Sequence, residues 1–237
     1  KSPDTPIASV TRSTAQKNGW IWDIALPERK GTGYVFCSDY CDDDTALDTL
    51  LKYLNDDPIV ADVDKASARF FSFKPGYRES PWQANCVAIG TSMGFLEPLE
   101  ASALVMVELA ASHLARHMPF TTEQLGPAAR QFNRIFSQRW SRVVDFLKLH
   151  YVLSKRDDSA YWRYMRNPDS GSEQLQDWLS MWRNRSPDPL DFNLREEVFP
   201  TASYLYVLQG MGFTPALSAR KKNAAGDSSK VRQRLQQ

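Results

Sequence analysis

The chain has 237 residues, a formal net charge of +1 and 24% charged residues, so its acidic and basic side chains nearly balance. This balance argues against a nucleic-acid partner and against electrostatic membrane binding, because both rely on a basic excess. The chain is long enough to bury a large core, and its seven tryptophans and twelve phenylalanines suit either that core or a pocket for a flat ligand.

Cysteine usage and hydropathy predict a soluble, cytoplasmic protein. Cys37, Cys41 and Cys86 form neither a CxxC pair nor an even-numbered disulfide framework. The longest apolar segment is interrupted by Glu108 and is too short to span a bilayer, so no membrane partner is expected. The chain begins at Lys1 with neither a methionine nor a signal-type apolar run, and we expect it to be a piece of a longer protein.

The first predicted element is a β-hairpin over residues 20–39. Residues 20–26 alternate as a strand does, residues 27–33 form the turn, and residues 34–38 return. Gly31-Thr32-Gly33 falls in this turn and lacks the third glycine and the following helix of a dinucleotide fingerprint. The chain therefore has no recognisable site for the pyrophosphate of a nucleotide cofactor.

Two tryptophans, Trp20 and Trp22, lie on the first strand of this hairpin. Side chains alternate along a strand, so both indoles are expected on one face. Core packing and a wall that separates two compartments are both consistent with that placement. A helix is predicted to follow from Asp42-Asp43-Asp44, whose charges complement the helix dipole and need no metal.

A further strand is predicted over residues 69–74, and a buried strand over residues 86–90. A turn then leads to an apolar helix from about residue 100 to residue 118. Glu97 and Glu100 lie at the start of this helix, where backbone N–H groups lack intrahelical partners and bind anions or polar groups. Each glutamate is therefore either a helix-start acid or a reagent.

The rest of the chain has a helical pattern. Helices are predicted between Thr121 and Asp191, with Gly126-Pro127 breaking one segment and residues 168–171 separating two more. One more helix is expected over residues 201–210, closed by glycine.

Two histidines, His113 and His117, are four residues apart on one predicted helix and could share a metal ion. No third ligand lies nearby in the sequence, so we expect ordinary surface or core histidines and no metal site. Neither histidine has a serine or cysteine partner at a telling spacing, which gives a hydrolytic triad no support.

The composition predicts an α+β fold with a β-rich front and a helical back. We place the boundary at residue 118, so that residues 1–118 form the front part and residues 119–218 the helical part. Residues 219–237 are polar and are expected to form a flexible tail.

Two segments together resemble the flavin-dependent tryptophan halogenases. Residues 19–24, Gly-Trp-Ile-Trp-Asp-Ile, are similar to the family's WxWxIP signature, with Ala25 in place of its proline, and residues 31–38 continue the match. Residues 82–92, followed by residues 94–100, are similar to the family's flavin and halide segment. The resemblance is close over about residues 17–120 and extends more loosely to about residue 215.

The resemblance implies that the chain is the C-terminal half of a two-part body. The front part would belong to a box-like flavin-binding module similar to flavin monooxygenases, and the helical part would hold the substrate. The half with the glycine-rich dinucleotide motif and the active-site lysine is not in this chain, which agrees with the missing fingerprint.

The resemblance also implies the reaction. FAD, reduced by a separate flavin reductase, would react with oxygen and oxidise chloride or bromide to hypohalous acid. This acid would halogenate tryptophan, another indole or another electron-rich aromatic, either a small molecule or a residue of a peptide. A homodimer is consistent with the resemblance.

Site residues are carried over position by position. Glu100 matches the active-site glutamate, which would polarise the oxidant or accept the ring proton. Ser102 and Ala103 match the halide positions, although the usual Glu-Ser-Thr-Gly run reads Glu-Ala-Ser-Ala here. The flavin positions are Gly90, Thr91, Phe95 and Leu96. The residues expected to line the substrate or separate it from the flavin are Trp20, Trp22 and Tyr204.

Two rival functions stay open. A flavin monooxygenase would hydroxylate its substrate, and halide-dependent product formation would distinguish it from a halogenase. A degenerate, non-catalytic ligand-binding protein is the second rival, and an upstream reading frame encoding a glycine-rich loop would count against it.

Overall fold

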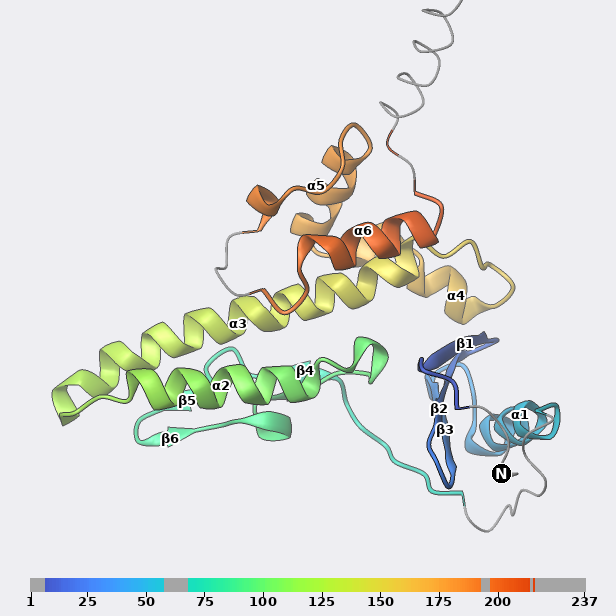
Figure 1. Ribbon diagram of the computed structural model, residues 1–237, viewed down its shortest axis with the longest axis horizontal. Coiled ribbons are helices and arrows are strands. Elements are labelled where there is room, and N and C mark those ends of the chain that lie inside the picture. Colours follow the sequence, from blue (N-terminus) through green and yellow to red (C-terminus); the bar gives the residue numbers. More distant parts are fainter. Residues whose placement is uncertain (1–6, 58–67, 193–196, 214, 216–237) are drawn as a thin grey trace, which may run out of the picture. The chain divides into compact units, whose positions relative to one another are not determined.

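The computed structural model describes residues 7–57, 68–192, 197–213 and 215 (Figure 1). The chain divides into two compact units, the first made of residues 1–74 and 155–166, the second of residues 75–154 and 167–237. Each unit contains both strands and helices, so the predicted α+β class is confirmed.

A three-stranded antiparallel sheet of order β1-β2-β3 forms the centre of the first unit. Its elements are β1 (Arg12–Gln16), β2 (Gly19–Ala25), β3 (Lys30–Phe36), α1 (Asp43–Asn55) and α4 (Ala160–Met165). The predicted hairpin is confirmed as the β2–β3 pair, in which Trp20 lies opposite Val35. Strand β1 was not predicted, because it is polar and its first residues are exposed.

The position of Gly31-Thr32-Gly33 corrects the sequence prediction. These residues belong to strand β3 and not to the turn, and Gly33 lies opposite Trp22. A Cβ atom at Gly33 would lie 2.6 Å from Nε1 of Trp22, and one at Gly31 would lie 3.4 Å from its Cζ3. The Trp22 indole therefore covers the two glycines, and their lack of side chains provides the room it needs.

Helix α1 is joined to the sheet by buried polar contacts. The Tyr53 hydroxyl donates to Oδ2 of Asp23 over 3.0 Å, and Lys30 forms an ion pair with the same carboxylate at 2.7 Å. Lys30 also contacts Asp57, just beyond α1. At the start of α1, Asp42 accepts a hydrogen bond from the Thr45 N–H at 2.7 Å, so this acid is a helix cap, as its position predicts.

Helix α4 is attached to the edge strand β1 by side chains that donate to its backbone. The Trp162 indole N–H donates to the Gln16 carbonyl at 2.7 Å, and Arg156 donates to the Ala15 carbonyl at 3.1 Å. The Arg156 guanidinium also lies over the Trp162 ring, 5.2 Å from its centroid. These contacts satisfy carbonyl groups that an edge strand would otherwise leave to solvent.

The second unit is built around one 31-residue helix, α3 (Thr122–Val152). Its other helices are α2 (Ala103–His117), α5 (Glu173–Trp182) and α6 (Thr201–Gly210), with 3₁₀ turns η2 (Gly90–Ser92), η3 (Leu99–Ala101), η4 (Pro168–Ser170) and η5 (Pro189–Asp191). Two short antiparallel pairs complete it, β4 (Gly76–Tyr77) with β7 (Gly94–Phe95), and β5 (Trp82–Gln83) with β6 (Cys86–Val87). The helix predicted over residues 201–210 is confirmed as α6.

One face of α3 forms the core of the second unit. Phe132, Phe136, Trp140, Val143 and Phe146 are buried and recur every three or four residues, as one helix face requires. This periodic burial explains why the predicted break at Gly126-Pro127 is wrong. The proline costs a backbone hydrogen bond in the second turn, but the apolar face beyond it holds the helix together.

Two strand predictions are also wrong. Residues 69–74 form no strand, and Phe71 is 82% exposed, because no described neighbouring strand pairs with this segment. The strand predicted over residues 86–90 is reduced to Cys86–Val87, with Cys86 exposed. Gly90 has a φ of +64°, which ends the extended conformation and begins η2.

The short strand β5 is fixed to α3 by one side chain. The carboxamide of Asn133 accepts from the Trp82 backbone N–H at 2.7 Å and donates to the Trp82 carbonyl at 2.9 Å. This side chain makes the pair of hydrogen bonds that a neighbouring strand would make.

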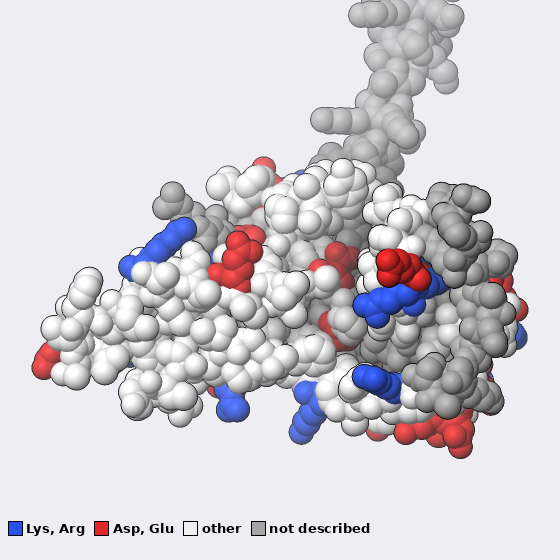
Figure 2. All heavy atoms as spheres, turned by 60° about the horizontal axis from the view of Figure 1, so that its bottom comes forward, with Lys and Arg blue, Asp and Glu red and all other residues white. Residues whose placement is uncertain are grey.

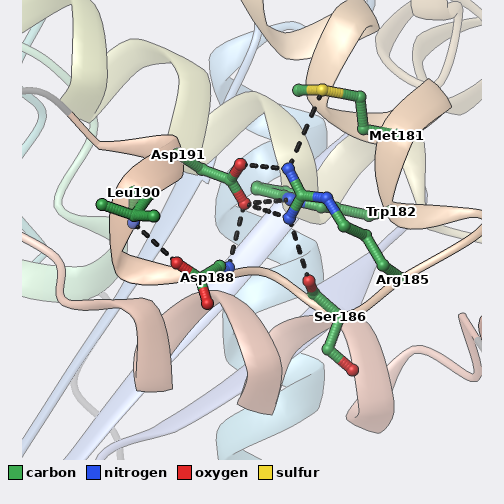
Figure 3. Close-up of polar contacts among 7 residues, drawn as sticks. All are labelled: Met181, Trp182, Arg185, Ser186, Asp188, Leu190 and Asp191. Atoms are coloured by element: carbon green, nitrogen blue, oxygen red, sulfur yellow. Dashed lines mark hydrogen bonds and ion pairs between the residues drawn. The ribbon is translucent and has the colours of Figure 1, made fainter.

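A polar cluster closes the loop after α5 (Figure 3). Asp191 accepts hydrogen bonds from the Trp182 indole at 2.9 Å, from Nη1 of Arg185 at 2.8 Å and from the Asp188 N–H at 2.9 Å. The Arg185 hydrogen bond is the largest of the causes that lower the pKa of Asp191 to about 2.

The Trp22–glycine contact predicts that Gly33→Ala destabilises the protein. The new methyl group must displace the indole, at a cost of about 1–3 kcal/mol. Urea unfolding measures this loss, and Gly76→Ala is the matched control, because a Cβ there meets nothing within 4 Å. Equal losses in the two variants would contradict the interpretation.

The Asp191 cluster predicts a pH-dependent contribution to stability. The folded-state pKa is below the ordinary value of 3.8, so the contribution is complete above about pH 4 and is lost as the pH falls through about 2. At pH 6 we expect Asp191→Asn to cost on the order of 1 kcal/mol, since the 43% exposed Arg185 side chain is partly screened. The gap between variant and native protein should narrow toward pH 2 in urea unfolding. Asp177→Asn, an exposed change on α5, should leave the native pH dependence in place.

Candidate active site

The turn between β7 and α2 carries the predicted catalytic residue, Glu100. Glu100 has a φ of 64° and a ψ of 6°, and Ala101 follows with a φ of 49°. Two successive residues other than glycine in the left-handed region cost on the order of 1 kcal/mol each. Such strain persists only where the surroundings impose it, and it occurs preferentially at functional sites.

His150, near the end of α3, is the polar partner of Glu100. Its Nε2 lies 3.2 Å from Oε1 of Glu100, and the two side chains are 20% and 40% exposed. The hydrogen bond from His150 lowers the pKa of Glu100, while burial acts in the opposite direction. Glu100 is therefore a carboxylate at neutral pH that remains open to solvent or substrate.

The histidine ring is itself held on its other side. Its Nδ1 lies 2.8 Å from the Phe146 carbonyl oxygen, one turn earlier on α3. The Phe146 ring meets the imidazole edge to face, with ring centroids 5.1 Å apart and an interplanar angle of 89°. The role of His150 is not evident from the sequence, because fifty residues separate it from Glu100 and only the folded chain brings them together.

The second predicted glutamate has a different environment. The hydroxyl of Tyr151, a buried residue, donates to Oε2 of Glu97 over 2.6 Å. Consecutive α3 residues, His150 and Tyr151, thus hold the two glutamates of one turn. A short charge-assisted bond from a buried phenol suits Glu97 to a structural role, whereas the more exposed Glu100 is suited to chemistry.

The predicted halide positions lie at the start of α2. Ser102 is buried, and its carbonyl accepts the Met106 N–H at 3.1 Å, which is the first hydrogen bond of this helix. The N–H groups of residues 103–105 therefore have no partner within the helix. Ala103 is exposed. Backbone donors and the positive end of the helix dipole together suit an anion, even with alanine at this position.

The predicted flavin positions surround the turn η2. Gly90 is in the left-handed region, and a Cβ there would meet only Cγ2 of Val107, at 3.5 Å. Thr91 is exposed, whereas Phe95 and Leu96 are half-buried. The turn is rigid because the Ser92 hydroxyl donates to the Ile89 carbonyl at 2.7 Å and accepts its N–H at 3.1 Å. A half-buried backbone without a side chain at Gly90 fits the close approach of a flat group.

The three predicted wall residues are buried to different degrees. In the first unit Trp20 is buried and Trp22 is half-buried. In the second unit Tyr204 is buried in a cluster of aromatic rings that includes Trp178, Phe146 and Phe192. The ring of Tyr204 is thus part of the core of the second unit, with 1% of its surface exposed.

The histidine pair on α2 lies against other aromatic rings. The His113 and His117 rings lie 4.7 Å apart, and His113 also packs against Phe132 at 5.4 Å. Within the described ranges no three histidine, cysteine, aspartate or glutamate side chains gather as metal ligands would. No helix among these residues has the length and apolar character needed to cross a membrane.

The outer face of α2 is largely apolar. Leu104 is 83% exposed, and Val107 is partly exposed one turn later. Figure 2 shows that the face in view carries its charged side chains as scattered groups between wide areas of uncharged residues. Water-exposed apolar area of this kind marks surfaces that bind other groups.

Comparisons with known proteins agree with the resemblance. The tryptophan 6-halogenase SttH of Streptomyces toxytricini is 34% identical over 228 residues, which cover 92% of this chain and 42% of that protein. The solved tryptophan halogenase from Shewanella frigidimarina NCIMB 400 is 41% identical with a TM-score of 0.83, over 99% of this chain and 46% of that one. BrvH, a flavin-dependent halogenase from Brevundimonas sp. BAL3, is 36% identical with a TM-score of 0.79, over 90% of this chain and 41% of that one.

The chain thus spans less than half the length of these relatives. The sequence model of the tryptophan halogenase family matches residues 1–227. Because this match covers nearly the whole chain, the protein belongs to the tryptophan halogenase family.

Proposed function

We propose that this chain is part of an FAD-dependent halogenase that acts on tryptophan, another indole or a similar electron-rich aromatic. The observation that carries the proposal is the Glu100 carboxylate, held in a left-handed turn at the start of α2 and paired with His150 at 3.2 Å. Family membership supports the reaction class, and the relatives named above support the substrate class.

The segment before α2 fits both small reactants. Gly90, Thr91, Phe95 and Leu96 would hold the flavin, and the N–H groups near Ser102 and Ala103 would hold chloride or bromide. When bound, reduced FAD together with oxygen would supply the oxidising power that converts halide to an electrophilic halogen. The helix start contributes by replacing the water of the halide with backbone donors.

Glu100 would act on the aromatic ring. In electrophilic substitution a ring carbon first gains the halogen. A base then removes the proton from that carbon, and the electron pair of the broken C–H bond restores the aromatic ring. The pKa of Glu100 is lowered by His150, so the carboxylate is ionised at neutral pH and can accept this proton.

Further parts of the proposal concern the surroundings of the reaction. Trp20 and Trp22 would separate the flavin from the substrate, and Tyr204 would support the substrate side from within the aromatic core. A separate flavin reductase would supply reduced flavin, and the cytoplasm is the proposed compartment.

The direct test is halogenation by the full-length protein that contains this chain. The protein would be assayed with a flavin reductase, FAD, NADH, bromide and a panel of indoles, with mass spectrometry of the products. We expect a brominated product, and a kcat reduced about 10²- to 10³-fold in Glu100→Gln, since the amide cannot accept a proton. Glu108→Gln, an exposed change on the same helix, should keep the native rate.

Other outcomes identify the rival functions. A hydroxylated product formed without halide would indicate a monooxygenase. Binding of indoles without any product would indicate a non-catalytic ligand-binding protein. A brominated product formed equally well by Glu100→Gln would remove Glu100 from the mechanism.

The proposed halide position predicts the effect of a negative charge at the start of α2. Ala103→Asp should raise the KM for bromide at least about tenfold, because like charges about 6 Å apart repel by about 3 kcal/mol at an effective dielectric constant of 20. Ala111→Asp introduces the same charge on an exposed position two turns later and should change this KM little. Equal effects of the two substitutions on the steady-state KM would place the halide elsewhere.

A further inference from the structure

The contacts of His150 determine where its protons lie. Its Nδ1 is 2.8 Å from the carbonyl oxygen of Phe146. A carbonyl oxygen can only accept a hydrogen bond, so Nδ1 carries a proton and donates it. A neutral imidazole has a single N–H group, and in that form the Nε2 atom would be a bare acceptor.

The second ring nitrogen faces a carboxylate oxygen. Nε2 of His150 and Oε1 of Glu100 are 3.2 Å apart, and two acceptors without a proton do not bond at that distance. The contact therefore contains one proton, either on an imidazolium beside a carboxylate or on a carboxylic acid beside a neutral ring. The lowered pKa of Glu100, whose largest cause is this hydrogen bond, agrees with a carboxylate as the acceptor.

The surroundings of the pair are ordered. Glu100 faces His150 from η3, and the neighbouring Tyr151 is engaged with Glu97 at 2.6 Å. The imidazole packs edge to face on Phe146, which lies in the buried face of α3. The ring is thus fixed by a backbone carbonyl, an aromatic edge and a carboxylate, each from a different direction.

We propose that His150 is the positioning residue of the site, which holds the Glu100 carboxylate ionised and in one orientation. This inference rests on the proposed function. The contact of Nε2 with Oε1 leaves Oε2 as the oxygen that accepts the ring proton. It also offsets the cost of the left-handed backbone at Glu100, because the turn presents the carboxylate to the end of α3.

Two substitutions at position 150 test whether a hydrogen-bond donor to Glu100 is needed there. His150→Phe keeps a planar ring and removes both nitrogens, and we expect kcat to fall by up to about 100-fold, the effect of a misplaced catalytic group. The KM for the indole should change little, because the loss concerns the transition state. His150→Gln restores an N–H donor without a charge and should recover part of kcat. His117→Gln, a histidine change on the exposed part of α2, should match the native protein.

The pH dependence of kcat distinguishes a positioning role of His150 from a purely structural one, because loss of a purely structural residue would not shift it. The acidic limb of kcat should follow ionisation of Glu100, whose pKa His150 lowers. In His150→Phe this limb should move to higher pH, because the largest cause of the lowered pKa is gone. An unchanged kcat and an unchanged limb in His150→Phe, with an active native enzyme, would overturn the inference and leave the proposed function intact.

A spectroscopic measurement tests the pair independently of turnover. In the full-length protein labelled with ¹⁵N-histidine, the His150 signals are identified by their loss in His150→Phe. We expect the ¹⁵N shifts of the His150 ring in the native protein to differ from those in Glu100→Gln, because the group facing Nε2 changes from a carboxylate to a carboxamide. His150 signals that are identical in the two proteins would overturn the inference, even if no halogenated product is found. Thermal melting of each variant shows that it is folded.

Discussion

The packing of one face of α3 is the constraint on which the rest of the second unit depends. The buried stripe from Phe132 to Phe146 fixes the helix in its core, so the residues on either side of the stripe are fixed too. Asn133 lies near one end and holds β5, whereas Tyr151 lies near the other and holds Glu97. At a rise of about 1.5 Å per residue, one rigid rod positions groups roughly 27 Å apart. Because the helix is packed into the core, the side chains at its end hold the residues of the candidate site in fixed positions.

The first unit depends on a different constraint, which is the room that the Trp22 indole needs above the sheet. Trp22 lies over Gly31 and Gly33, so the sheet accepts a large ring without a bulge in its backbone. On β2, the buried Asp23 is compensated by Tyr53 and Lys30, which tie the same strand to α1. An aromatic residue and a buried acid on one strand are thus both satisfied by contacts that lie beyond that strand.

Local patterns predicted the parts of the fold that local interactions determine. The β2–β3 hairpin, the start of α1 at the aspartate triplet and helix α6 follow from alternation, the helix dipole and helical spacing within short segments. Predictions failed where a distant partner decides. The glycines of β3 were assigned to a turn because their partner, Trp22, is nine to eleven residues away. The aromatic residues at 69–74 suit a strand, but no described strand pairs with them.

The candidate site divides in the same way. Glu100, Ser102, Ala103 and the flavin positions come from one continuous motif, and in the structure they lie on η2, β7, η3, the links between them and the start of α2. His150 was not available, because a lone histidine on a helix carries no signal until the fold brings a carboxylate to it. A buried tyrosine such as Tyr204 shows the converse, since its neighbours in sequence do not reveal that its ring belongs to a core.

The left-handed conformation of Ala101 has a consequence for engineering and evolution. Glycine would adopt the φ of 49° without a steric penalty, so this chain forgoes stability that a single change could recover. The methyl group, however, restricts the backbone next to Glu100 to fewer conformations than glycine would allow. Selection for thermal stability alone would therefore favour a looser turn at the position where orientation matters most. Stabilisation of this protein is therefore better sought elsewhere in the chain.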